Sequence, residues 1–200
     1  MTTSHLLDGL MGAFVGAALS AWAVLFAQWR QHVKERTAAV RALLVEMMRN
    51  ATVALTVSNT AEQFFKARQA QPSATSSAAN LSEIEKQFLK DYSDRTWSEQ
   101  LPLLADRFDW ATLKACREAY SYASTYFYSI AANADGFGLS TGAFATATRK
   151  FTIAIERARD SHRWIHGKLL RRAEQREFED ELKHLTESAQ KRLKEYGLHH

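Results

Sequence analysis

The longest uncharged stretch of the chain, residues 9–27, reads GLMGAFVGAALSAWAVLFA. As a helix with a rise of 1.5 Å per residue it would be roughly 28 Å long, close to the ~30 Å hydrocarbon core of a bilayer. No Lys or Arg precedes it, and Asp8 does, whereas a cleavable signal peptide opens with basic residues. The pattern predicts an uncleaved N-terminal transmembrane anchor over residues 1–29.

Charge on the two sides of this stretch predicts its orientation. Trp29 suits an interfacial aromatic belt, and basic residues follow it at Arg30, Lys34, Arg36 and Arg41. Basic residues favour the cytoplasmic side of a membrane. We therefore expect a single-pass protein with its N-terminus outside and its C-terminal domain in the cytoplasm.

Small residues line one side of the same stretch. Gly12 and Gly16 form a GxxxG pair, and Ser20 extends the spacing. Such rows allow two helix backbones to approach closely within a bilayer. This face predicts membrane-helix packing and a homo-oligomer, although Gly and Ala are also simply frequent in membrane helices.

Beyond the anchor, apolar residues recur at spacings of three and four, the period of a helix. The pattern predicts that the first helix runs to residue 69, either unbroken or loosened near residues 28–32. A low-complexity, flexible loop is expected at 71–81. Further helices are predicted over residues 82–92, 98–107 and 110–134, and from a cap at Ser140 or Thr141 onwards.

These helices have apolar stripes that should form one core. The stripe positions are Val33, Val40, Leu44, Met47, Ala51, Ala54, Ala61 and Phe65, then Leu113, Cys116, Tyr120, Ala123, Phe127, Ile130 and Ala134, then Phe144, Phe151, Ile155, Ala158, His162, Ile165 and Leu169. The predicted fold is all-α, with an antiparallel four-helix-type bundle over residues 30–171. Residues 172–200 form a long, charged amphipathic helix (Phe178, Leu182, Leu185, Ala189 and Leu193 on its apolar side) that projects from the bundle or pairs with a copy of itself.

Composition agrees with a helical protein. Only two Pro and eight Gly occur in 200 residues, which argues against a strand-rich fold. The single cysteine, Cys116, excludes an intramolecular disulfide and a multi-cysteine metal site. The formal net charge of +4 is low for a dedicated nucleic-acid binder.

One segment is nevertheless strongly basic. Residues 149–176 hold nine basic residues against three acidic ones. The basic surface is represented by Arg157, Arg163, Lys168, Arg171 and Arg172. It could contact anionic lipid headgroups or, less favourably, nucleic-acid phosphates. A solvated helix face paired with acids such as Asp91, Asp94 and Asp106 is the simpler explanation, ahead of lipid and then nucleic acid.

The sequence offers only weak evidence for a metal site. His162 and His166 are four residues apart, a spacing at which two imidazoles can share a metal ion. A third ligand is missing nearby, and His162 falls on the apolar stripe, where a hydrogen-bonded core histidine is commoner. We predict no metal and no cofactor.

Aromatic residues crowd one helix between positions 120 and 128. They are Tyr120, Tyr122, Tyr126, Phe127 and Tyr128. Core packing explains them better than an aromatic ligand pocket does. Buried tyrosine hydroxyls need partners, which Glu46, Asn50 or Asn133 could provide.

A combination of short motifs resembles a known group of proteins. A single N-terminal span precedes LLVEMMRN at 43–50, a Ser/Thr-rich break, Thr96-Trp97 and Ala119-Tyr120. This is similar to a loose group of short, membrane-anchored bacterial proteins without assigned function. The matching residues are Glu46, Asn50, Trp97, Tyr120 and Asn133. The resemblance implies a location at the bacterial inner membrane and no known activity.

No Walker loop, GxSxG elbow or HExxH motif occurs, and no carboxylate pair stands out as an acid/base couple. The chain is therefore expected not to be an enzyme. The leading hypothesis is a membrane-anchored, non-enzymatic protein-interaction, scaffold or regulatory module, which forms a homo-oligomer and binds an unidentified protein partner. The alternative is a module that contacts anionic lipid or nucleic acid through residues 149–176.

Overall fold

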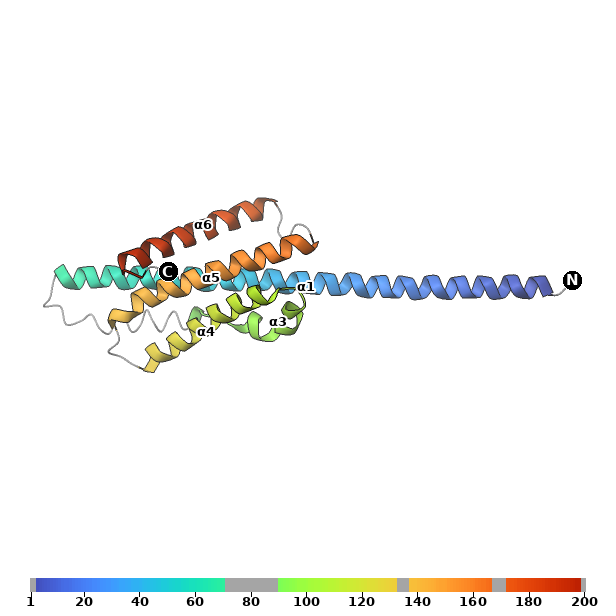
Figure 1. Ribbon diagram of the computed structural model, residues 1–200, viewed down its shortest axis with the longest axis horizontal. Helices are drawn as coiled ribbons and strands as arrows, with labels where there is room; N and C mark the ends of the chain where they lie inside the picture. The colour runs from blue at the N-terminus through green and yellow to red at the C-terminus, as the bar shows by residue number, and fades with distance from the viewer. Residues whose placement is uncertain (1–2, 71–89, 133–136, 167–171, 199–200) are drawn as a thin grey trace. The chain divides into compact units, whose positions relative to one another are not determined.

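The computed structural model describes residues 3–70, 90–132, 137–166 and 172–198. Over these residues the chain forms five helices and no strand, which confirms the all-α class. The helices are α1 (Thr3–Ala70), α3 (Arg95–Ala105), α4 (Trp110–Ala132), α5 (Phe137–His166) and α6 (Arg172–Glu195) (Figure 1). Helix α1 continues without a break through residues 28–32, where the sequence analysis allowed either a continuous or a loosened helix.

The chain divides into two units, residues 1–38 and residues 39–200. In the first unit every side chain from Ala13 to Trp29 is exposed. The aromatic rings of Trp22, Phe26 and Trp29 lie along one side, with centroids 5.5 and 5.8 Å apart. Over the described residues, none of the helices combines the length and apolar character that crossing a bilayer requires, so the structure does not support the predicted transmembrane helix.

The second unit is a helical bundle with the predicted core. The stripe positions from Val40 to Ala54 on α1, from Cys116 to Ala123 on α4 and from Phe144 to Ala158 on α5 are buried, as are Leu182, Leu185, Ala189 and Leu193 of α6. Val33, Leu113 and Phe178 are only partly buried, and the side chains of the remaining stripe positions lie outside the described part. Phe151 and Ile155 of α5 are fully buried, as are Val40 and Met47 of α1. Burying the large apolar side chains of such stripes is the main favourable term in packing helices together.

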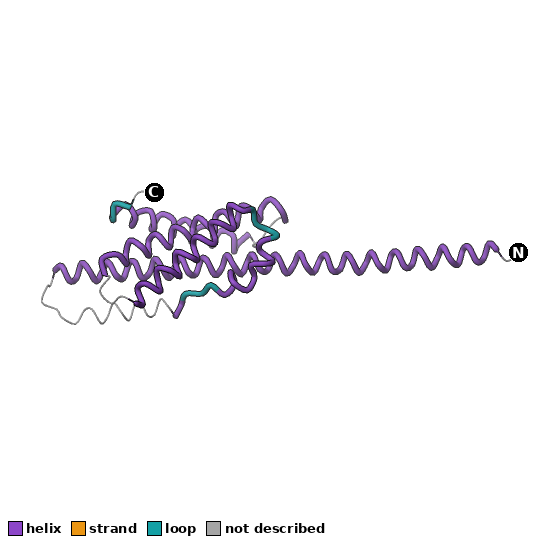
Figure 2. The backbone as a smooth tube through the Cα atoms, turned by 60° about the horizontal axis from the view of Figure 1, so that its bottom comes forward, coloured by secondary structure: helices purple, strands orange, loops and turns teal. Residues whose placement is uncertain are grey.

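The expected antiparallel arrangement is only partly correct. Figures 1 and 2 show α5 running opposite to the two helices it packs against, α4 and α6. However, α6 runs in the same direction as α1, since Thr52 bonds Glu181 and Asn59 bonds Arg192. This direction follows from the path of the chain, which comes back along α1 before the next helices begin. Ser93 contacts Glu46, so the chain travels back about 36 Å along α1 after Ala70.

The charged C-terminal helix does not project from the bundle. The apolar side of α6 is buried within the second unit, where the helix packs against α5. Near its end, the Arg192 guanidinium donates hydrogen bonds of 2.9 and 3.2 Å to the Asn59 side-chain oxygen and forms an ion pair with Glu62. The apolar stripe therefore has its partners inside this chain.

Helix boundaries agree best where a local cap decides them. Asp109 caps α4 as predicted, because its carboxylate accepts the Thr112 N–H at 2.7 Å. Interaction with the Thr112 side chain, and then the bond from the Thr112 N–H, lower the pKa of Asp109. By contrast, α5 begins at Phe137, ahead of the proposed caps Ser140 and Thr141, and α3 begins at Arg95 rather than near residue 98. The predicted loop at 71–81 and most of the helix at 82–92 lie outside the described residues.

Candidate functional site

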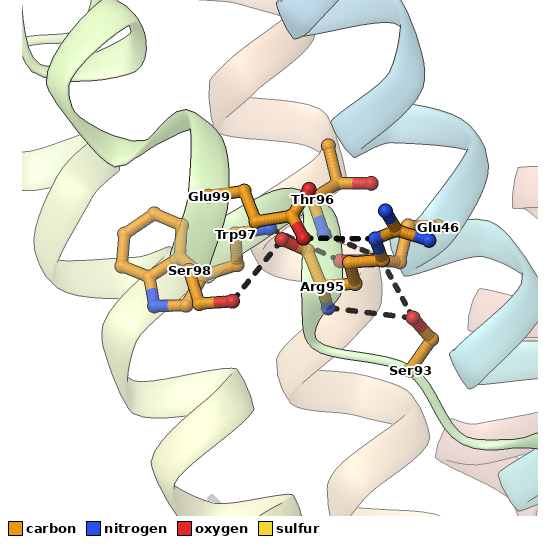
Figure 3. Close-up of polar contacts among 7 residues, drawn as sticks. All are labelled: Glu46, Ser93, Arg95, Thr96, Trp97, Ser98 and Glu99. Carbon is orange, nitrogen blue, oxygen red and sulfur yellow. Dashed lines mark hydrogen bonds and ion pairs between the residues drawn. The ribbon is translucent and has the colours of Figure 1, made fainter.

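A buried carboxylate joins three helices of the bundle, and Figure 3 shows its contacts with the start of α3. The side chain of Glu46 on α1 is 8% exposed. One carboxylate oxygen, Oε2, accepts the Thr96 N–H at 2.8 Å and the Ser93 hydroxyl at 3.0 Å. The other, Oε1, accepts the Tyr120 hydroxyl of α4 at 2.8 Å and the Trp97 N–H at 3.3 Å.

This carboxylate provides the N-terminal cap of α3. Asp94, at the N-cap position, makes no side-chain cap hydrogen bond. Instead, Glu46 accepts the N–H groups of Thr96 and Trp97 in the first turn, where a negative charge is favoured by the helix dipole, and the Arg95 N–H donates to the Ser93 hydroxyl oxygen. Four donors compensate the cost of burying the charge. The cap explains why α3 begins at Arg95, earlier than local sequence signals indicated.

Asn50, one turn after Glu46, fixes the segment before α3. Its side-chain amide donates to the Ser93 carbonyl oxygen at 2.6 Å, and its oxygen accepts the Ser93 N–H at 3.2 Å. Asn50 is fully buried. Glu46 and Asn50 therefore fix the backbone of residues 93–97 against α1.

Aromatic rings continue the same contact. The Trp97 ring stacks on Tyr120 with centroids 5.5 Å apart and an interplanar angle of 10°. Tyr120 meets the edge of Phe151 on α5 at 5.3 Å. Burial, and then the negative charge of Glu46, raise the pKa of Tyr120, so its hydroxyl stays protonated and acts as a donor.

Trp97 also forms part of a groove of about 680 Å³ on the outer side of α3 and α4. The residues of α4 that line it follow helical spacing and so share one face of the helix. The lining consists of Trp97 and Leu101 of α3, Trp110, Leu113, Lys114, Arg117, Glu118, Ser121, Tyr122 and Thr125 of α4, and Lys150 of α5.

The groove carries more positive than negative charge. Three of its lining residues are cationic, and Glu118 is its only acid. The Glu118 carboxylate lies 3.8 Å from the Lys114 ammonium and 3.9 Å from that of Lys150. Lys150 also lies 5.5 Å from the centroid of the Tyr122 ring. Arg117 has no ion-pair partner among the described residues. This arrangement suits the binding of an apolar group that carries a negative charge.

The structure brings together four residues that the sequence singled out. Glu46, Asn50, Trp97 and Tyr120 form one network, and Glu46 is the hydroxyl partner that was proposed for a buried tyrosine. Asn133 lies outside the described residues.

The small-residue face lies on the exposed surface of the first unit. Ser20 donates its hydroxyl to the Gly16 carbonyl at 2.8 Å, and a Cβ added at Gly16 would meet no atom within 4 Å. The surroundings of Gly12 are outside the described part. His162 and His166 fall within α5, but their side chains are not among those described, so the metal hypothesis is untested.

The basic segment is not one helix. It is divided between α5, which ends at His166, and α6, which begins at Arg172. Arg157 donates to the Ala111 carbonyl at 3.1 Å, and Arg159 lies 3.3 Å from the Asp160 carboxylate. Both side chains therefore have partners within the bundle. Arg163, Lys168, Arg171 and Arg172 have side chains outside the described part.

Sequence reasoning overlooked the groove residues Leu101, Trp110 and Arg117. The signal was present as a second apolar and cationic stripe on the 110–132 helix, beside the core stripe and bordering it at Leu113. Trp110, Leu113, Arg117 and Ser121 repeat at spacings of three and four. Such a stripe is hard to distinguish from an ordinary solvated helix face before the neighbouring α3 is placed.

Comparisons with protein-family models, curated proteins and solved structures found no match for this chain. Its assignment to a function therefore depends on the geometry of the groove, the Glu46 network and the exposed apolar segment.

Proposed function

We propose that this chain is a non-enzymatic helical module that is tethered to a membrane by its N-terminal segment and binds other proteins through its bundle. The observation that carries the proposal is the exposure of the apolar side chains before Arg30. Phe14 is 76% exposed, Trp22 66% and Leu25 63%. Exposed apolar surface of this extent is typical of membrane or protein contact sites.

Lipid is the covering that suits this segment best. Large apolar side chains occur on several sides of the helix, and a helix that is apolar all round is typical of a membrane span or a buried core. In the sequence the apolar run begins at Gly9, ahead of the first described side chain at Ala13. Trp29 and the basic residues after it support an N-terminus outside and a bundle in the cytoplasm, at the inner membrane of a bacterium.

The tether is tested by alkaline carbonate extraction of membranes that contain the full chain. We expect the wild-type chain to stay in the pellet and a Leu19→Asp/Leu25→Asp variant to move to the supernatant. Val45→Asp is the matched control, because Val45 is 59% exposed but lies in the second unit. Release of the wild-type chain by carbonate would refute the tether.

We further propose that the face of Gly12, Gly16 and Ser20 packs two copies of the chain together. Crosslinking in native membranes should recover a dimer, together with a protein partner of the bundle. Gly16→Ile should abolish the dimer, whereas Leu19→Ile, which changes a neighbouring large residue, should preserve it. Recovery of monomer alone, without any partner, contradicts the interaction role.

The second candidate function is contact with anionic lipid, or less favourably nucleic acid, through residues 149–176. Its support is the excess of nine basic over three acidic residues. The full chain should bind vesicles that contain phosphatidylglycerol more tightly than neutral vesicles. Replacing Arg163, Lys168, Arg171 and Arg172 with Gln should remove this preference, and a preference that survives the replacement eliminates the candidate.

A further inference from the structure

We propose that the groove between α3 and α4 is a binding site for a small amphiphilic anion, an aromatic or acyl carboxylate whose apolar body lies in the groove and whose head faces Arg117. This proposal is independent of the tether and of the protein partner.

The apolar body is indicated by side chains that are poorly covered. Trp110 is 74% exposed and Leu101 is 38% exposed, although both line the groove. Trp97, Leu113 and Tyr122 are the other aromatic and aliphatic residues of the lining. A flat or linear apolar group placed among these side chains would remove the indole of Trp110 from water and stack on aromatic faces.

The size of the groove favours a small molecule over a partner helix. Its volume of about 680 Å³ lies within the range of roughly 300–1,000 Å³ that small-molecule sites occupy. One wall is α3, which has only 11 residues and is about 16 Å long. A partner helix of typical length would extend past that wall and lose contact with Trp97 and Leu101.

The charge of the groove selects an anion. Lys114 and Lys150 share the single carboxylate of Glu118, so their combined charge is only half compensated. Arg117 also lines the groove, one turn after Lys114 on α4, and has no ion-pair partner among the described side chains. A guanidinium binds a carboxylate through two parallel hydrogen bonds, a geometry that suits the head of the proposed ligand.

The wall of the site is fixed before any ligand binds. Glu46 accepts the Trp97 N–H, and the Trp97 ring stacks on Tyr120, which itself bonds Glu46. Trp97 is therefore held from the core side while it lines the groove. A rigid wall reduces the ordering cost of binding. Glu46 acts here as a positioning residue.

The test uses the full chain in lipid nanodiscs and two isosteric probes, 2-naphthoate and its neutral amide, with empty nanodiscs as the blank. Isothermal titration calorimetry should give one site per chain. We expect 2-naphthoate to bind the wild-type chain at least about 5-fold more tightly than the amide. Arg117→Gln should make the two Kd values equal, whereas Arg95→Gln, which removes an exposed cation outside the groove, should leave the ratio unchanged.

The apolar part of the site is tested separately. Trp110→Ala should weaken both probes about 10-fold or more, and Trp22→Ala, which removes an exposed tryptophan of the first unit, should weaken neither. Ser121→Trp adds bulk on the exposed side of α4 without disturbing the core, so it should block binding in a folded protein. Far-UV circular dichroism and the unfolding midpoint verify that each variant is folded.

Three results of the binding measurements would overturn the proposal. They are the absence of saturable naphthoate binding, equal affinity for the acid and the amide in the wild-type chain, and binding that survives both Trp110→Ala and Ser121→Trp. A photocrosslinking residue at position 101 that captures a protein in the native membrane would identify the groove as a protein-docking site instead and would likewise reject the small anion.

Discussion

The Tyr120 hydroxyl donates a 2.8 Å hydrogen bond to the buried Glu46 carboxylate, although 74 positions separate the two residues in the chain. Tyr120 lies on α4 and Glu46 on α1, and the same carboxylate caps α3. One side chain thus determines where α3 begins and connects it to two longer helices. Stability of this part of the bundle should depend on Glu46 more than on any single surface charge.

Glu46→Gln should destabilise the chain by about 2–3 kcal/mol. The amide retains the size of the side chain, but its NH₂ group faces N–H donors that lose their acceptor. The measurement is guanidinium-induced unfolding followed by circular dichroism. Glu99→Gln is the control, because Glu99 forms only an exposed i,i+4 pair with Arg95 and should contribute less than about 0.5 kcal/mol. An equal loss of unfolding free energy in the two variants would contradict a role for Glu46 in capping.

Tyr120→Phe should cost about 1–2 kcal/mol, because it removes one hydrogen bond to a charged acceptor and keeps the stack on Trp97. The double variant with Glu46→Gln should cost less than the sum of the single variants by about 1 kcal/mol, since both changes remove the same bond. Tyr196→Phe, near the end of the chain, serves as the control and should be nearly neutral. If the two losses of stability simply add, the Tyr120 and Glu46 side chains are not energetically coupled.

The Cys116 thiol should be inert in the folded chain. Burial raises its pKa from 9.0 to about 12, so almost no thiolate forms at pH 8. A disulfide reagent should label it only after denaturation. Labelling of the native chain at the rate of the unfolded chain would show that the thiol is accessible.

The same shift in pKa predicts how stability changes with pH. Because the folded form holds its proton more tightly, this stabilising contribution is complete below pH 9 and is lost as the pH rises towards 12. From pH 8 to pH 10 the free energy of unfolding should fall by about 1 kcal/mol more in the wild-type chain than in Cys116→Ala. Parallel pH profiles for the two proteins would disprove the shift.

Arg192→Met should loosen the end of α6. The guanidinium donates twice to Asn59 and pairs with Glu62, so its loss removes both donors from the Asn59 oxygen and leaves Glu62 with Lys66 as its ion-pair partner. We expect a cost of about 1–2 kcal/mol and faster amide exchange near the C-terminal turns of α6, with α5 unaffected. Lys191→Met removes the adjacent exposed charge as the control. Unchanged exchange in Arg192→Met would mean that the apolar stripe alone holds α6.

Residues with a periodic local environment were predictable from the sequence. The spacing of Phe144, Phe151 and Ile155 identified the core side of α5, and Asp109 identified the start of α4. The start of α3 was not predictable, because its cap is Glu46, on another helix. The sequence predicted no direction for α6 relative to α1, because residues 172–200 were placed outside the bundle. Local patterns reveal faces and local caps, whereas long-range pairing and the groove need the fold.

The sequence separations within the Glu46 network imply an order of events in folding. Its bonds to Ser93 and Tyr120 close loops of 47 and 74 residues, and the entropy of closing a loop grows with its length. The contacts between α4 and α5 are closer in sequence, as between Glu118 and Lys150. That hairpin should therefore form first, and Glu46 should show φ-values near zero. Because its N-terminal cap arrives only with α1, α3 should become helical in the last cooperative step.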